Sequence, residues 1–250
     1  MDNTVTRTDI TGKVIVERRH WSFSAIDKFN KCPRKFFYYD VVKAIQEPEN
    51  ANMKNGFRVH KAMADFVTLA KPLPPDMERY GDWVTTMITG QPNEKVLAEH
   101  KMGMTFDLIP CEYFSRKHKV WLRTVADLLV INGSHALSVD WKTGAEPDDR
   151  YETLPKNFQL RLVALTVFLH FPHVQTVENK YVYLPAATST QFTMERADLR
   201  EFIPQMYEIA GGLQKAVRAN EWPPHPSGLC KKHCAVTQCQ YHGIGSYGGG

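Results

Sequence analysis

The segment 120–142 constrains the fold most, because it predicts two strands joined by a tight turn. Residues 120–131 form a β-branched and apolar run, and residues 136–142 alternate between apolar and polar side chains. The dipeptide Asn132-Gly133 between them is a strong short-range signal for a hairpin. We therefore expect an antiparallel strand pair over this segment.

This predicted hairpin places two carboxylates on one face of a sheet. If the Asn-Gly dipeptide forms a two-residue turn, Ser138 lies opposite Asp127, and Asp140 becomes the diagonal neighbour of Asp127. Strand alternation puts Lys142 on the same face as Asp140. A four-residue turn would keep this shared face, whereas a three-residue turn would break it.

Two carboxylates in a partly buried site repel each other and lose hydration, and a divalent cation relieves both effects. Oxygen ligands suit magnesium or manganese. A neighbouring lysine can orient a water molecule or stabilise charge on a phosphate. The spacing alone is weak evidence, because Asp140-Trp141-Lys142 is one of three acid–x–lysine triplets, beside Glu99-His100-Lys101 and Glu178-Asn179-Lys180. The alternative is a solvated hairpin face with a simple Asp–Lys ion pair.

A helix predicted over about 52–69 carries a candidate metal ligand. Its apolar residues recur at helical spacing, and His60 shares their face with Phe57, Ala64 and Val67, so we expect the imidazole to point inward. A core histidine is the commoner reading of this pattern. Gln159, at the start of a helix that begins near Pro155, is equally ordinary by itself.

The order of elements predicts a mixed α/β fold. Helices precede the hairpin, and a helix, two short strands and a final amphipathic helix follow it. We expect an N-terminal arm, a helical N-terminal part, a core, a cysteine-bearing segment and a flexible tail, over residues 1–20, 21–95, 96–220, 221–242 and 243–250. With 43% hydrophobic residues and no sustained period, the composition of these 250 residues excludes disorder, collagen and coiled coil.

The sequence shows neither a stretch that could span a membrane nor a signal peptide pattern, so we expect a cytoplasmic protein without a membrane partner. The net charge of +4 is too small to indicate nucleic-acid binding by itself. The basic residues do cluster, and the clusters give tentative DNA contacts at Arg34, Lys35, Arg116, Lys117 and Lys119.

Five cysteines in such a chain argue against a disulfide framework. Cys111 stands alone and reads as a packed thiol. Cys230, Cys234 and Cys239 lie within ten residues of one another, and Cys32 lies far upstream.

Several separated motifs, in this order, resemble the PD-(D/E)XK nuclease superfamily, specifically its RecB-type exonuclease branch with CRISPR-adaptation and phage relatives. They are Ser22-Phe23-Ser24, Cys32-Pro33-Arg34-Lys35-Phe36-Phe37-Tyr38, Gly56-Phe57-Arg58-Val59-His60, Ala126-Asp127, Asp140-Trp141-Lys142-Thr143-Gly144 and Gln159-Leu160. The resemblance spans about residues 22–240. Family members often have a tyrosine four residues after the glutamine, where this chain has Val163.

The resemblance implies a restriction-endonuclease-like core that cuts DNA with Mg²⁺ or Mn²⁺. His60, Asp127 and Asp140 would be metal ligands, and the main-chain carbonyl of Trp141 would be a further one. Asp127, Asp140, Lys142 and Gln159 would be the catalytic residues.

The resemblance also implies that Cys32, Cys230, Cys234 and Cys239 hold a [4Fe–4S] cluster. The C-x3-C-x4-C spacing of the last three differs by one residue from the expected C-x2-C-x5-C. His233 and His242 are alternative ligands, so a zinc site is one alternative to the cluster, and a segment without any metal is another.

The expected activity is that of a metal-dependent DNA exonuclease on single-stranded or end-frayed DNA, in replication, recombination or repair. The partner of such an enzyme would be a helicase or a recombination protein, and the location would be the host cytoplasm for a phage protein. One rival is a structure-specific endonuclease on the same core. The other is a non-catalytic DNA-binding or adaptor protein built around the cysteines.

Overall fold

The computed structural model describes residues 4–8, 14–18, 20–46, 51–146 and 154–244. The chain divides into two compact units, one of residues 1–48 with 203–250 and the other of residues 49–202. Most of the expected flexible tail, residues 245–250, lies outside the described residues.

The second unit is built on a six-stranded mixed sheet, in the order β4-β3-β5-β6-β7-β8. The β6–β7 pair is parallel and the other pairs are antiparallel. A parallel neighbour needs a crossover, and helix α5 (Phe158–His170) supplies it between β6 and β7. The strands are β3 (Lys95–Met104), β4 (Pro110–Cys111), β5 (Leu122–Asn132), β6 (His135–Lys142), β7 (Thr176–Tyr183) and β8 (Thr188–Glu195). The expected mixed α/β fold is confirmed.

The central hairpin forms, but its turn differs from the prediction. Asn132 pairs with His135, so Gly133 and Ser134 are the two turn residues. Gly133 has a φ of +57°, which tight hairpin turns require and glycine adopts without strain. The register therefore shifts by two residues. A shift of two preserves the face of every side chain, so the predicted shared face of the acidic residues does not depend on this error.

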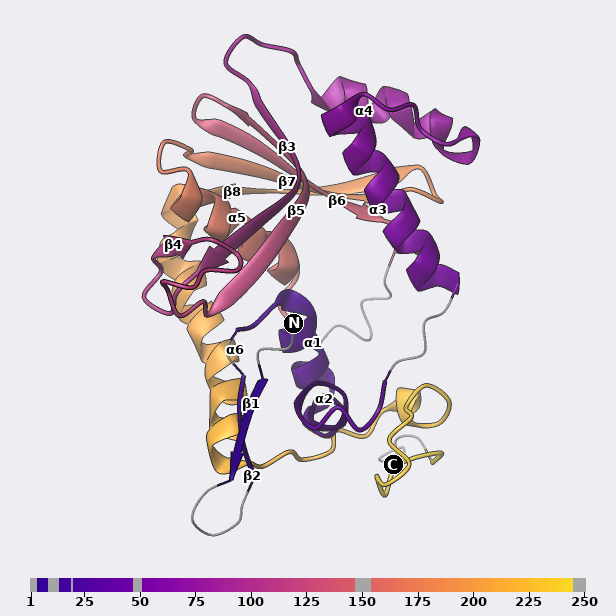
Figure 1. The fold of residues 1–250 in the computed structure, drawn as a ribbon, viewed down its shortest axis with the longest axis vertical. Helices are drawn as coiled ribbons and strands as arrows, with labels where there is room; N and C mark the ends of the chain where they lie inside the picture. Colours follow the sequence, from indigo (N-terminus) through magenta and orange to yellow (C-terminus); the bar gives the residue numbers. More distant parts are fainter. Residues whose placement is uncertain (1–3, 9–13, 19, 47–50, 147–153, 245–250) are drawn as a thin grey trace. The chain divides into compact units, whose positions relative to one another are not determined.

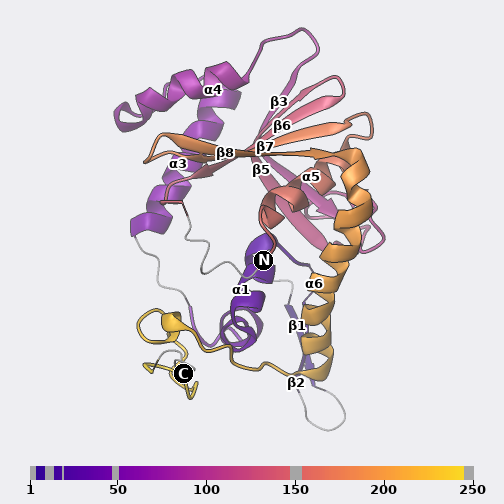
Figure 2. The ribbon, with the colours of Figure 1, turned by 180° about the vertical axis from the view of Figure 1, so that it is seen from behind.

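Helices cover both sides of this sheet (Figures 1 and 2). Helix α3 (Ala51–Leu69), the 3-10 helix η2 (Pro75–Tyr80) and α4 (Gly81–Met87) pack on one face, over a buried cluster that includes Leu128, Val139 and Trp141. Helix α5 packs on the other face. Nine of its thirteen residues are buried, as expected for a helix that is apolar all round.

The predicted apolar face of α3 is wrong in one respect. Val59 and Met63 are its buried residues, whereas Phe57 is 71% exposed. His60 lies at the edge of the buried face and is partly exposed. Because α3 has apolar residues on more than one side, their helical spacing alone does not show which side packs on the sheet.

The first unit joins the two ends of the chain. It contains the hairpin of β1 (Thr4–Thr8) and β2 (Val14–Arg18), helices α1 (Phe23–Lys31) and α2 (Pro33–Phe36), and the π-helix η1 (Phe37–Val41). Helix α6 (Leu199–Ala219) runs into this unit, and the 3-10 helix η5 (Gly228–Cys230) lies in the cysteine-bearing segment. Trp222 packs on Phe29, Phe36 and Phe37, with ring centroids 5.4–6.4 Å apart.

In the described part of the chain, we find no helix that has both the length and the apolar character needed to span a bilayer.

Candidate active site

The two acidic strands separate where Asp127 and Asp140 face each other. Backbone pairing between β5 and β6 ends at Leu128 and Val139, one residue before the two aspartates. Beyond this point the Asp127 carboxylate pairs with β6, since its Oδ2 accepts a 2.8 Å hydrogen bond from the Trp141 backbone N–H. The carboxylate is thereby fixed in the opening between the strands.

Asp127 also marks a change of face along β5. The Thr124 hydroxyl lies 2.6 Å from that of Thr166 on α5, whereas Leu128 packs in the cluster under α3. Strict alternation would put residues 124 and 128 on the same face, so the alternation breaks between them. As a result, Asp127 can turn toward α3.

Glu99 on β3 is a residue of the candidate site that the sequence did not reveal. Its neighbours Ala98 and His100 pair with Leu128 and Ala126, which places Glu99 beside Asp127. Its φ of +48° is uncommon for a residue other than glycine. This backbone turns its carboxylate toward α3 as well.

His60 on α3 lies between these two carboxylates. Its Nδ1 is 3.3 Å from Asp127 Oδ1 and 3.4 Å from Glu99 Oε1, and its Nε2 is 3.0 Å from the Trp141 carbonyl oxygen. Hydrogen bonds to Asp127 and then to Glu99 raise the pKa of His60 from 6.5 to about 10, against the opposing effect of burial. The protonated ring supplies the positive charge that two adjacent carboxylates require.

These three residues fit a divalent metal ion. The ligand atoms of His60, Glu99 and Asp127 all lie within 4.8 Å of one another, and no other group of three or more His, Cys, Asp or Glu residues in the described part meets this criterion. Glu99 Oε1 is buried without a hydrogen bond of ordinary geometry. Two carboxylates with one imidazole suit Mg²⁺ or Mn²⁺.

Asp140, Lys142 and Gln159 form a second, adjacent group. Lys142 Nζ is 2.8 Å from Asp140 Oδ1 and donates to Gln159 Oε1 at 3.1 Å, while Gln159 Nε2 donates to Asp140 Oδ2 at 2.6 Å. Burial raises the pKa of Asp140 to about 6; Lys142 opposes this rise, and Asp127 adds to it. Each side chain in this group thus fixes the position of the other two.

Tyr181 on β7 joins this second group from an unexpected place in the sequence. It lies in register with Asp140, its hydroxyl donates to Gln159 Oε1 at 3.3 Å, and its ring lies 4.8 Å from Lys142 Nζ. The tyrosine expected one helical turn after Gln159 is absent, and a strand residue contacts the glutamine instead. Only the parallel pairing of β6 with β7 brings it there, which no local pattern could show.

The structure thus divides the predicted metal ligands. It brings His60 and Asp127 together and adds Glu99. Asp140 is held by Lys142 and Gln159, and the Trp141 carbonyl faces the His60 ring.

The four cysteines of the predicted cluster all belong to the first unit. Cys32 Sγ accepts weak hydrogen bonds from the backbone N–H groups of Lys35 and His225, at 3.4 and 3.5 Å. The second contact links Cys32 to the segment that precedes the other three. Burial raises the pKa of the Cys234 thiol, and the neighbouring Cys230 and Cys32 add to the rise. Nevertheless, no three of these sulfur atoms gather within 4.8 Å.

The tentative DNA contacts differ in their surroundings. Arg116, Lys117 and Lys119 are exposed on the segment before β5. Arg34 Nε donates to the Trp222 carbonyl at 2.8 Å, so this side chain helps to hold the C-terminal segment. Lys35 Nζ lies 5.2 Å from the ring centre of Tyr39.

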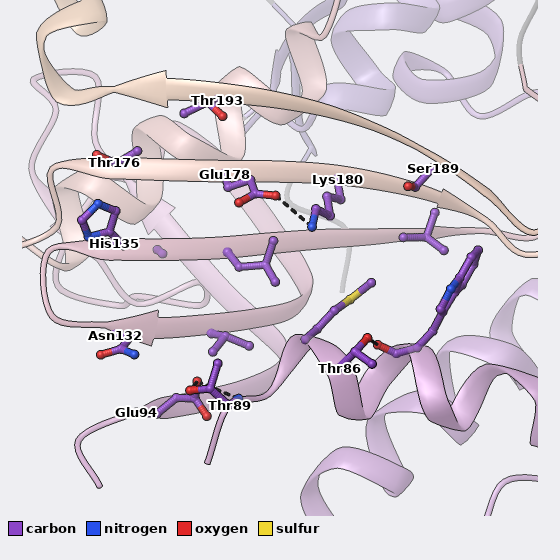
Figure 3. Close-up of a pocket in the computed structure, with 16 residues that line it drawn as sticks. Thr86, Thr89, Glu94, Asn132, His135, Thr176, Glu178, Lys180, Ser189 and Thr193 are labelled. Atoms are coloured by element: carbon purple, nitrogen blue, oxygen red, sulfur yellow. Dashed lines mark hydrogen bonds and ion pairs between the residues drawn. The ribbon is translucent and has the colours of Figure 1, made fainter. Parts of the chain in front are cut away.

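A separate pocket of about 530 Å³ lies over the sheet beside α4 (Figure 3). Its polar lining includes Thr176, Thr193, His135 and the ion pair of Glu178 with Lys180, at 2.8 Å. None of the candidate catalytic or metal-binding residues lines it. The candidate active site is therefore the opening between β5 and β6, below α3.

Comparison with known proteins identifies the class to which this fold and site belong. The chain is a member of the PD-(D/E)XK nuclease superfamily, whose profile matches residues 20–240. This is a class of metal-dependent nucleases, which implies DNA as substrate. A solved structure described as "Crystal structure of SSO0001" is similar, with 14% identity over 90% of this chain and 87% of that chain and a TM-score of 0.39. No curated protein matches the sequence.

Proposed function

We propose that the protein is a DNA exonuclease that hydrolyses phosphodiester bonds of single-stranded or end-frayed DNA, in replication, recombination or repair. One observation carries this proposal: His60, Glu99 and Asp127 meet within 4.8 Å, next to Asp140, Lys142 and Gln159 in mutual contact. The resemblance of the ordered motifs to the RecB-type branch supports action at DNA ends.

His60, Glu99 and Asp127 would hold the metal ion, with Asp140 close by. Bound there, the ion would supply Lewis acidity toward the scissile phosphate and lower the pKa of a water molecule. Lys142 would hold the attacking water or stabilise the developing charge on the phosphate. Gln159 would keep Lys142 and Asp140 oriented, since it bonds to both.

The activity test uses end-labelled linear DNA, single- and double-stranded, and circular DNA of the same sequence. Each is incubated with Mg²⁺, Mn²⁺ or EDTA. The proposal requires metal-dependent release of short products from linear DNA and survival of the circles. Cutting of circular DNA would favour the rival endonuclease, and no cutting with either metal would favour a non-catalytic binding protein.

We further propose that Cys32, Cys230, Cys234 and Cys239 bind a metal, either as a [4Fe–4S] cluster or as zinc. The support is their membership of one unit and the contact from the His225 backbone to Cys32. The sulfur atoms would have to move closer together when the metal binds. Anaerobic purification gives the direct test, because a protein that holds the iron–sulfur cluster is brown whereas a zinc protein is colourless.

A further inference from the structure

Two adjacent aromatic rings lie on the segment between β4 and β5. The ring centres of Tyr113 and Phe114 are 4.7 Å apart, at an interplanar angle of 73°. Phe114 is 66% exposed, although phenylalanine is among the residues most often buried. An exposed ring that its neighbours hold in place can contact a ligand.

Two cationic side chains hold these rings. The Arg123 guanidinium carbon lies 4.9 and 5.0 Å from the two ring centres, and Lys101 Nζ lies 5.9 Å from both. Arg123 itself is buried. Cation–π contacts of this kind fix the rings and place positive charge next to them.

A glycine allows the segment to lie this close to the sheet. A Cβ atom at Gly103 would come within 3.0 Å of the carbonyl oxygens of Cys111 and Glu112. Gly103 pairs with Cys111, two residues before Tyr113, and also lies in register with Arg123. The close approach at Gly103 therefore places both rings over Arg123 and Lys101.

The rings lie on the same side of the sheet as the candidate metal site. Thr124 contacts α5, so its neighbour Arg123 faces the opposite side, as Asp127 does. Lys101 follows Glu99 by two residues on β3, a separation of about 7 Å along the same face. A DNA strand whose scissile phosphate lies at the candidate metal site could therefore reach the rings without crossing the sheet.

The charge of this region suits a polyanion. Residues 101–123 contain five lysine and arginine side chains against two acidic ones, Asp107 and Glu112. The basic residues Arg116, Lys117 and Lys119 are exposed just beyond the rings. Proteins that bind single-stranded DNA usually combine basic contacts to the phosphate backbone with aromatic rings that stack on the bases.

We propose that Tyr113 and Phe114 form a stacking platform for an unpaired base of single-stranded DNA, adjacent to the scissile bond. The platform selects a flexible or frayed strand, because a base inside a duplex has no free face to offer. This inference rests on the proposed function and extends it to the choice of substrate.

The experiment measures binding of a labelled single-stranded oligonucleotide to the full chain in EDTA, where no cleavage occurs. A second oligonucleotide carries abasic positions instead of bases. The variants are Phe114→Ala and Phe114→Leu, and the control is Leu69→Ala, which removes another exposed apolar side chain, 58% exposed and at the end of α3. Thermal melting establishes that each variant is folded.

We expect Phe114→Ala to weaken binding by about 5- to 150-fold, the range for one aromatic–base stack. Phe114→Leu should weaken it nearly as much, because an aliphatic side chain lacks the π-face, and Leu69→Ala should have no effect. The wild type should prefer the normal oligonucleotide to the abasic one, and Phe114→Ala should lose that preference. Equal binding of both oligonucleotides by the wild type, or a preference retained by Phe114→Ala, would overturn the platform.

Cleavage assays with Mg²⁺ or Mn²⁺ separate this inference from the proposed function. If hydrolysis depends on Lys142 but the base preference is absent, only the platform is wrong. If the base preference is present but neither metal supports hydrolysis, the nuclease proposal is wrong and the platform stands.

Discussion

At the residue scale, the site sets two cationic side chains against three carboxylates. His60 stands between Asp127 and Glu99, and Lys142 lies against Asp140. In the absence of a metal ion, the imidazolium takes the place that a cation would otherwise fill. Metal binding must therefore displace a proton from His60, because only the neutral ring is a ligand.

The raised pKa of His60 gives a pH-dependent stability to the metal-free protein. A group whose pKa rises from 6.5 to about 10 on folding stabilises the native state fully below pH 6.5, and this effect is lost as the pH rises toward 10. We expect the melting temperature in EDTA to fall between about pH 7 and pH 10. His60→Gln should make this fall shallower; an unchanged pH profile in that variant would contradict the assignment.

Removal of either member of the Asp140–Lys142 pair should abolish hydrolysis. Asp140→Ala and Lys142→Ala each remove a group in the opening between β5 and β6, and we expect the initial rate to fall by at least about 100-fold. The fold should persist, since the core cluster under α3 is untouched. Initial rates and circular dichroism check both parts, and near-normal turnover by either folded variant would refute the active-site assignment.

Sequence reasoning predicted most of the residues that meet in the candidate site, but not all of them. Asp127, Asp140 and Lys142 could be placed together because one hairpin carries them. Glu99 could not, because its place depends on the pairing of β3 with β5 and on a left-handed backbone conformation. Its one signal was the Glu99-His100-Lys101 triplet, and acid–x–lysine triplets of this kind also arise by chance.

At the element scale, small residues decide where the chain can turn or approach itself. The prediction chose Asn132-Gly133 for the hairpin turn, and the structure moved the turn by one residue while keeping the glycine in it. The predicted helix over 52–69 is confirmed nearly to the residue, yet Phe57 on its predicted buried face is exposed. Periodicity fixes the type of an element more firmly than its register or orientation, because tertiary packing decides the latter two.

A pair of glycine variants tests the close approach at β4. Gly103→Ala should destabilise the fold by about 1–3 kcal/mol, because the added methyl group meets two backbone oxygens that cannot move separately. Gly212→Ala, inside α6 with no atom beyond the adjacent helix backbone within 4 Å of the added group, should instead stabilise the fold by about 0.5–1 kcal/mol. Chemical denaturation measures both. A neutral Gly103→Ala would show that the segment before Tyr113 is free to shift.

At the scale of the whole molecule, the two ends of the chain meet in one unit. Local sequence patterns could not predict that the two ends come together, although the proposal of one metal shared by an early cysteine and three late ones suggested it. A metal shared by these cysteines would close a loop of about two hundred residues, which restricts the unfolded chain more than the folded one.

The cysteine proposal predicts a joint loss of metal and stability. Cys32→Ser and Cys234→Ser should each lower the amount of bound metal and the melting temperature, with a loss of several kcal/mol in the free energy of unfolding. Cys111→Ser is the matched control, because Cys111 belongs to the second unit and is buried beside Gly103. Elemental analysis and thermal melting are compared for all three. If Cys32→Ser keeps its full metal content, Cys32 is not a ligand.

At Glu99, the residue that best suits the backbone differs from the residue that the candidate metal site needs. A residue other than glycine with φ near +48° carries about 1–2 kcal/mol of strain, which the surrounding sheet must hold. Selection for heat resistance alone would favour glycine at this position and would thereby remove a carboxylate from the candidate metal site. We therefore expect variants selected for thermal stability alone to replace Glu99 with glycine early and to lose metal-dependent activity as a result.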